Sequence, residues 1–318
     1  MAELEMEREK FLVKFKKSQR KARIVTAIIM FGLTFVLLFV VGDNLGWKLS
    51  QPDFLKINSF MDIFDNNKAY FYFVITGAIY IMIVLIINHS TICVGEYDDY
   101  KRAYRRVIAS EVLNEKFSDV VLDHTKGLDE LRVRDMGIID MGTSFLSDDY
   151  YRAKYRDISF ESGDIETSHK VSDGDGGTDT ITDFAGQYYI MNYSKEVSDK
   201  VRVLPATKQY RKKENYIEME DAEFNEYYSV LASNIEDVHR VLTSKLIETL
   251  KVLGHNKLET ITVGFVGNKV HIANYSYEDM FEFNPIKKLD IEAEKNKIRE
   301  QLKSTIQLMD MLDSESKF

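Results

Sequence analysis

Residues 260–274, with the sequence TITVGFVGNKVHIAN, decide the structural class of the folded part of this chain. Apolar and polar residues alternate over 260–266 and again over 269–274, which is the pattern of β-strands with one buried face. The dipeptide Gly267-Asn268 between the two runs is typical of a type II′ turn, because glycine adopts the positive φ needed at the first central position. We therefore predict a β-hairpin here.

Helical periodicity lies on both sides of this predicted hairpin. Residues 233–236 have the spacing of a capping box, and the apolar residues that follow predict one helix over 235–253, ending at Gly254. After the hairpin, an amphipathic helix is predicted from about Asp290 to the C-terminal region. Two helices are predicted upstream, over 97–117 and, with Asp221 as its cap, over 218–228.

Four further strands are predicted between these helices, over 158–161, 165–171, 184–192 and 201–204. Residues 172–180, SDGDGGTDT, should form a mobile loop between two of them. The loop begins like an EF-hand calcium site, but the residues that this site requires are missing further along, so we expect no calcium there. Together the elements predict an α+β domain with a mostly antiparallel sheet and packed helices.

Two uncharged apolar runs precede this domain. Residues 24–41 read IVTAIIMFGLTFVLLFVV and residues 70–87 read YFYFVITGAIYIMIVLII. A helix of this length comes close to crossing the roughly 30 Å hydrocarbon layer of a bilayer. We predict a transmembrane hairpin over 24–93, with spans at 24–41 and 70–90 and a short exported loop between them. A cleaved signal peptide is the alternative for the first run, but no A-x-A-like site follows it.

The distribution of basic residues predicts the orientation of this hairpin. The segment 1–23 carries eight Lys or Arg residues, and Lys101, Arg102, Arg105 and Arg106 follow the second run. Cytoplasmic flanks carry the excess of Lys and Arg, so both termini should face the cytoplasm from the inner (plasma) membrane. This gives a basic segment 1–23, the hairpin and a cytoplasmic domain over 94–318. The four later basic residues would lie against lipid headgroups or on a solvated helix face.

Charge and cysteine content limit the classes of partner. The chain has a net charge of −9, but residues 69–318 carry 31 basic and 43 acidic residues, a net charge of −12. A domain this acidic repels a phosphate backbone, so we expect no nucleic-acid partner. Cys93 is the only cysteine, which excludes an intramolecular disulfide and is compatible with the cytosol.

The sequence contains no recognisable catalytic or cofactor motif. The histidines of the predicted domain are scattered without the spacing of a metal face, and no phosphate-binding or nucleophile motif occurs. The acidic residues Glu218, Glu220, Asp221 and Glu223 could act as acid, base or ion ligands, but helix capping explains them equally well. We assign no catalytic, cofactor-binding or metal residue and expect no cofactor.

Several short stretches of the domain resemble a bacterial family of membrane proteins known as domain of unknown function number thirty-one thirty-seven. They are 149–155 (DYYRAKY), 158–161 (ISFE) with Asp164, 184–186 (FAG), 219–225 (MEDAEFN), 241–243 (VLT), 265–273 (FVGNKVHIA) and 280–282 (MFE). Ala153 and the pair Gln187-Tyr188 depart from the family's usual residues. The resemblance implies the membrane hairpin and a LemA-type membrane protein as a partner, and no catalytic residue.

These observations favour a membrane-anchored protein-interaction or scaffold module whose partners are the lipid bilayer and at least one protein. Two alternatives stay open. One is a membrane-tethered enzyme of unrecognised class, and the other is an accessory subunit of a transporter or envelope complex.

Overall fold

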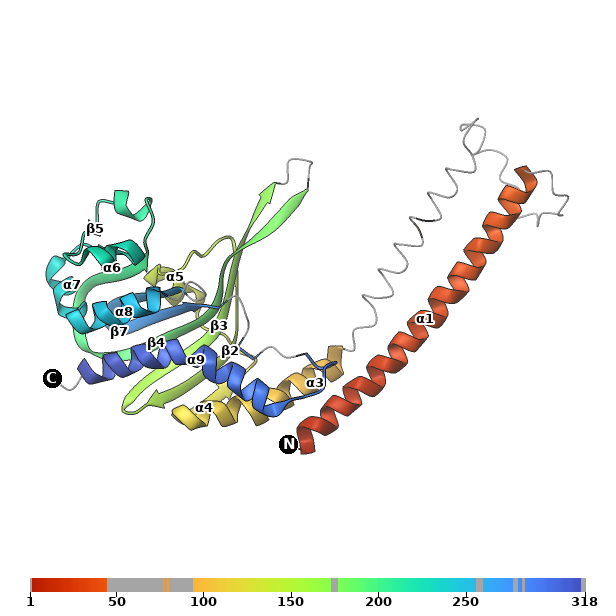
Figure 1. Cartoon of the computed structure of the whole chain (residues 1–318), viewed down its shortest axis with the longest axis horizontal. Coiled ribbons are helices and arrows are strands. Elements are labelled where there is room, and N and C mark those ends of the chain that lie inside the picture. The colour runs from red at the N-terminus through yellow and green to blue at the C-terminus, as the bar shows by residue number, and fades with distance from the viewer. Residues whose placement is uncertain are drawn as a thin grey trace. The chain divides into compact units, whose positions relative to one another are not determined.

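The computed structural model describes residues 2–44, 77, 79, 94–172, 177–255, 260–276, 280, 281 and 284–315. The chain divides into two compact units, Met1–Lys101 and Arg102–Phe318. Figure 1 shows the path of the chain and its element labels. The candidate binding site lies wholly in the second unit.

The first unit contains helix α1 (Ala2–Asn44) and most of helix α3 (Val94–Tyr104). The first predicted span, 24–41, is helical as part of α1, although the side chains of residue 30 and of residues 33–44 lie outside those described. The second, 70–90, lies outside the described residues except for Gly77 and Ile79. Among the residues whose side chains are described, no helix is long and apolar enough to cross a membrane. The hairpin has no support here and stays a prediction.

A continuous helical path follows, as predicted over 97–117. Helix α3 leads into a π-helical turn, η2 (Arg105–Ala109), and then into helix α4 (Ser110–Lys116). The predicted period holds, because Tyr104, Ile108 and Val112 are all fully buried. A π-turn inside a helix shifts the angular position of every side chain after it, and such turns often occur at functional positions.

A seven-stranded antiparallel sheet forms the centre of the second unit and confirms the predicted α+β class. Strand β4 is its axis, because β7 runs along one edge of β4 while β3 and then β6 share the other edge. The path across the sheet is β1-β2-β3-β4-β6-β5. The strands are β1 (Ser118–Asp123), β2 (Ser144–Tyr155), β3 (Ile158–Ser172), β4 (Thr178–Pro205), β5 (Tyr216–Ile217), β6 (Tyr228–Ala232) and β7 (Thr260–Tyr275).

The four predicted short strands are parts of two long ones. Residues 158–161 and 165–171 both belong to β3, and residues 184–192 and 201–204 both belong to β4. The predicted loop over 172–180 is shorter than expected, since β4 already begins at Thr178; residues 173–176 lie outside those described.

The predicted hairpin at Gly267-Asn268 is wrong, because residues 260–275 form the single strand β7. Both halves of β7 pair with β4 instead of with each other. The positive φ expected for Gly267 is nevertheless present, at 54°. Gly267 lies where the register between β4 and β7 shifts. Asn192 pairs with Lys269 and Val197 with Gly267, so more residues of β4 than of β7 lie between the two pairs. Gly267 therefore lies at a β-bulge, which bends a strand without reversing its direction.

The helices differ from the prediction in two places. The capping box predicted over 233–236 is wrong, because Asn234 and not Ser233 caps α7, accepting a 2.9 Å hydrogen bond from the Glu236 amide. Asp221 caps α6 (Ala222–Tyr227) by accepting a hydrogen bond from the Phe224 amide, as predicted. The single helix predicted over 235–253 is wrong, since α7 (Ile235–Val241) ends and α8 (Ser244–Gly254) begins anew with Thr243 as its cap. A threonine side chain that caps its own N-terminal turn competes with continuation of the preceding helix.

The two faces of the sheet are covered differently. Helices α8 and α9 (Ile291–Glu315, the predicted terminal helix) lie over one face, where Tyr155 on β2 donates a 2.5 Å hydrogen bond to Asp310 on α9 (Figure 1). The other face packs against α5 (Glu130–Met136) and the residues around it. This second core is formed by Leu128, Val133, Met136, Ile138, Met141, Ile165, Phe184, Tyr188, Ile190, Leu204, Leu231 and Ala273. It covers only part of that face.

Candidate binding site

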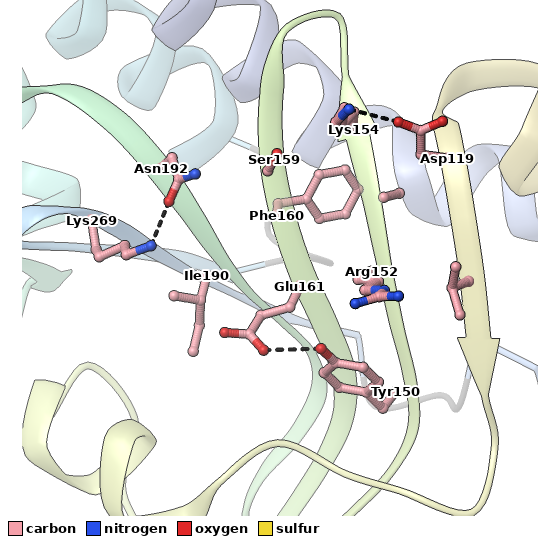
Figure 2. Close-up of a pocket in the computed structure, with 12 residues that line it drawn as sticks. Asp119, Tyr150, Arg152, Lys154, Ser159, Phe160, Glu161, Ile190, Asn192 and Lys269 are labelled. Atoms are coloured by element: carbon pink, nitrogen blue, oxygen red, sulfur yellow. Dashed lines mark hydrogen bonds and ion pairs between the residues drawn. The ribbon is translucent and has the colours of Figure 1, made fainter.

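A polar hollow of about 490 Å³ lies on the part of the sheet that α5 does not cover (Figure 2). Its lining comes from β1, β2, β3, β4 and β7, so it belongs to the sheet surface and not to a loop. We call it the sheet hollow. It is lined by Asp119, Val121, Tyr150, Arg152, Ala153, Lys154, Ser159, Phe160, Glu161, Ile190, Asn192 and Lys269.

The alternation of strand side chains places most of these residues on one face, whereas the side chains of Ala153 and Phe160 are buried on the opposite one. Successive side chains of a strand point to opposite faces, so Tyr150, Arg152 and Lys154 point to the hollow while Tyr151 and Tyr155 are buried under the helices. The register then aligns the neighbours, with Arg152 opposite Glu161 and Glu161 opposite Ile190. Arg152, Glu161 and Ile190 thus form one row across β2, β3 and β4.

Two of the charged groups in the sheet hollow are already neutralised. Lys154 pairs with Asp119 at 2.7 Å, and this hydrogen bond raises the pKa of Lys154. Glu161 pairs with Arg132 of α5 at 2.6 Å and accepts a 3.1 Å hydrogen bond from the Tyr150 hydroxyl. Burial, and then the charge of Glu161, raise the pKa of Tyr150, so this phenol stays a hydrogen-bond donor at neutral pH.

Two cations of the sheet hollow have no counter-charge among the described residues. Arg152 is exposed and makes no ion pair or side-chain hydrogen bond with any of them. Lys269 donates to the side-chain oxygen of Asn192, which is neutral, as the dashed line in Figure 2 marks. The sheet hollow therefore offers two free positive charges within a domain that is acidic as a whole, and it is suited to an anionic ligand.

The histidines of the domain do not converge on a common site. His271 on β7 is buried against the Tyr188 hydroxyl at 2.9 Å, and His169 pairs with Asp183 at 2.7 Å. His255 lies 3.4 Å from Glu223, outside the sheet hollow. His124 lies in the turn after β1 and His239 in α7, and neither lines the sheet hollow.

The acidic residues around 218–223 are used for structure. Lys251 of α8 lies 2.9 Å from Asp221 and 3.1 Å from Glu223, and its hydrogen bond to Glu248, followed by those to Asp221 and Glu223, raises the pKa of Lys251. Capping and ion pairing thus occupy both carboxylates, whereas no ion pair involves Glu218 or Glu220 among the described residues.

A second acidic group lies under the helices, where Asp148, Asp149 and Asp164 bring carboxylate oxygens within 4.8 Å of one another. The guanidinium of Arg105 lies in this group, hydrogen-bonded to Asp149 and 3.9 Å from Asp148. A cation is thus already in place, and we assign no metal site. The position of Arg105 also corrects the expectation that it faces headgroups or solvent, because its side chain is only 4% exposed.

The buried imidazole of His271 makes stability depend on pH. Burial, and then the charge of Arg132, lower the pKa of His271 to about 4. The unfolded chain therefore binds a proton more readily than the folded one between about pH 6.5 and 4, so stability is full above pH 6.5 and is lost as the pH falls through this window.

Lowering the pH from 7.5 to 5 should therefore cost about 2 kcal/mol through His271. We expect urea unfolding of His271→Gln to lose this part of the pH dependence, while the exposed His239→Gln keeps it. A pH dependence that is equal in His271→Gln and the parent would contradict the assignment.

The fold and the sheet hollow define a class: an α+β domain with an antiparallel sheet, covered by helices on one face and carrying a polar binding surface on the other. The model of a family described as a protein of unknown function, DUF3137, matches residues 182–314. The match runs from β4 to α9 and confirms the family resemblance for this part of the chain, which holds the stretches from 184–186 to 280–282, whereas 149–155 and 158–161 with Asp164 lie outside it. It includes Ile190, Asn192 and Lys269 of the sheet hollow, but begins after Arg152.

Comparisons with other proteins add little. No curated protein matches the chain. Among solved structures, the crystal structure of the mycobacterial trehalose monomycolate transport factor A, TtfA, is similar at 9% identity and a TM-score of 0.33. The alignment covers 66% of this chain and 97% of that one. A likeness at this level carries no conclusion about function.

The sequence contained a signal for the sheet hollow that the strand predictions missed. Residues 150–155, YYRAKY, alternate between the two faces, and the predicted strands began only at Ile158. Reading this period of two would have placed Arg152 and Lys154 on one face of β2. No local pattern in the sequence indicated that Lys269 would line the same surface as Arg152 and Lys154.

Proposed function

We propose that this chain is a membrane-anchored interaction module, which recruits a protein partner through the sheet hollow. The observation that carries the proposal is the incomplete cover of the second sheet face. A face of an antiparallel sheet is normally either packed against other elements or exposed to solvent as a whole. Here α5 covers only one part of the face. The uncovered part carries the two cations without a counter-charge beside the buried Ile190. Polar groups around an apolar floor are typical of a recognition surface.

Membrane anchoring rests on the sequence. The uncharged runs 24–41 and 70–87 have the length of transmembrane helices, and the surrounding Lys and Arg residues favour cytoplasmic termini at the inner membrane. On this proposal the domain stays close to the bilayer, which raises the local concentration of membrane-bound partners. A LemA-type membrane protein is the first partner to test.

A photo-crosslinking experiment tests both parts of the proposal. A benzophenone amino acid replaces the exposed Ser159 in the sheet hollow, and cells are irradiated before their membranes are washed with alkaline carbonate. We expect the chain to stay in the washed membranes and to form one dominant protein adduct, identified by peptide mass spectrometry.

The matched control carries the same amino acid at Lys303, whose side chain is 72% exposed on α9. That position should not form the adduct. Release of the chain by carbonate would refute anchoring, and an equal adduct at both positions would refute recognition by the sheet hollow. If residue 159 forms no protein adduct and the purified chain retains a small metabolite, the alternative of a membrane-tethered enzyme is favoured.

A further inference from the structure

The two free cations of the sheet hollow extend from strands that are not neighbours, and Lys269 is hydrogen-bonded to Asn192 in its own row. Arg152 lies on β2 and Lys269 on β7, three strand steps away through β3 and β4. Neighbouring strands are about 4.8 Å apart, and Lys269 lies two residues from the row of Arg152, which adds about 7 Å along the strands. The two backbone positions are therefore roughly 15 Å apart.

The surface between these cations disfavours a continuous anion. Glu161 lies between Arg152 and Lys269, as Figure 2 shows, and its carboxylate, already paired with Arg132 and the Tyr150 hydroxyl, offers no donor to a phosphate placed above it. Ile190 is buried at the floor beside it, while Asn192 and Ser159 present neutral polar side chains. A ligand must therefore carry negative charge at its two ends and neutral or apolar groups in between.

An extended peptide meets this requirement. It advances about 3.3 Å per residue and its side chains alternate between two sides, so two carboxylate side chains four residues apart lie on the same side and span roughly 13 Å. We propose that the sheet hollow binds an acidic segment of a protein partner in extended form, with one carboxylate on Arg152, a second on Lys269 and an apolar residue over Ile190. This inference rests on the proposed recruitment of a partner and specifies the chemistry of its contact.

Peptide binding by the full chain in detergent micelles tests this inference. The probes are fluorescein-labelled peptides with two glutamates separated by one to eight positions, and with one leucine between them in a serine background. We expect the tightest binding, by fluorescence polarisation, when the glutamates are four residues apart, and weaker binding at five, where they point to opposite sides of the extended peptide. Substitution of both glutamates by glutamine should abolish it.

Variants of the two cations locate the binding. Arg152→Gln and Lys269→Gln should each weaken it roughly fivefold, the upper range for exposed ion pairs, and the double variant by roughly 20-fold or more. Lys303→Gln, which removes an exposed charge from α9, should leave the affinity unchanged. Circular dichroism of each variant establishes that the fold is retained.

Several results would overturn the inference. They are failure of every peptide to bind the parent, equal affinity at all glutamate spacings, and full competition by sodium tripolyphosphate, which would indicate a general anion site. A crosslinked partner at residue 159 that persists in the Arg152→Gln/Lys269→Gln double variant would refute the acidic contact while leaving recruitment intact. Spacing-dependent peptide binding without any crosslinked partner would instead refute the proposed function.

Discussion

Replacing Arg105 with methionine should lower the free energy of unfolding by about 3–5 kcal/mol, the cost of leaving one charge of a buried ion pair without its partner. Arg105 is 4% exposed and its partner Asp149 is fully buried. Methionine fills much of the same volume, so the loss arises mainly from the isolated carboxylate and not from a cavity. Pulse proteolysis of the full chain in detergent micelles, over a urea series, measures the change.

Two further variants separate the charge effect from packing. Asp149 has a φ of 53°, a conformation that asparagine tolerates well, so Asp149→Asn removes the charge with little backbone strain. The double variant Arg105→Met/Asp149→Asn should recover part of the lost stability. Arg106→Met, at the exposed neighbouring position, should change it by less than about 1 kcal/mol. If Arg106→Met costs as much as Arg105→Met, the buried ion pair does not explain the effect.

Replacing Gly186 with alanine should cost roughly 3 kcal/mol, because the added methyl group has no space between β4 and β7. An ideal Cβ at this position would lie 2.0 Å from the backbone carbonyl oxygen of Asn274 and 3.1 Å from the amide nitrogen of Ser276. A backbone cannot rotate away as a side chain can, so the strands must separate. The adjacent hydrogen bond from the Ser276 amide to the Ala185 carbonyl, 3.2 Å long, should then weaken.

Gly267→Ala is the matched control for this prediction. Its Cβ would meet no atom within 4 Å, so only the positive φ of 54° opposes the substitution. That conformation costs an L-residue about 1–2 kcal/mol. Urea unfolding by the same proteolysis assay should therefore rank Gly186→Ala as the more damaging variant. The reverse order would mean that β4 and β7 are not as closely paired at Gly186 as the structure has them.

Features set by neighbouring residues were predictable from the sequence. Asp221 caps α6 because its side chain reaches an amide three residues later, and the period of apolar residues places α9 and the path from α3 to α4. The family resemblance was also carried by short local stretches. In each case the cause lies within about one turn or a few strand residues, so the local pattern contains it.

Features that depend on pairing partners were not predictable in this way. An alternating run with a central glycine can be a hairpin or a bent strand, and only the presence of β4 beside both halves makes β7 one strand. Likewise, the sequence pattern placed Arg105 with the basic residues that face headgroups or solvent and did not reveal its partner Asp149, which is 44 residues away in the chain.

The sequence by itself determined the α+β class, the Asp221 cap of α6 and the positive φ of Gly267, since these follow from periodicity and from interactions between near neighbours. Only the tertiary structure decided the sheet hollow and the buried Arg105–Asp149 pair. Arg152, Glu161, Ile190 and Lys269 come from four strands, and their common surface exists only once the register of β2, β3, β4 and β7 is set. That register is fixed by burial across the whole sheet, which no local segment contains.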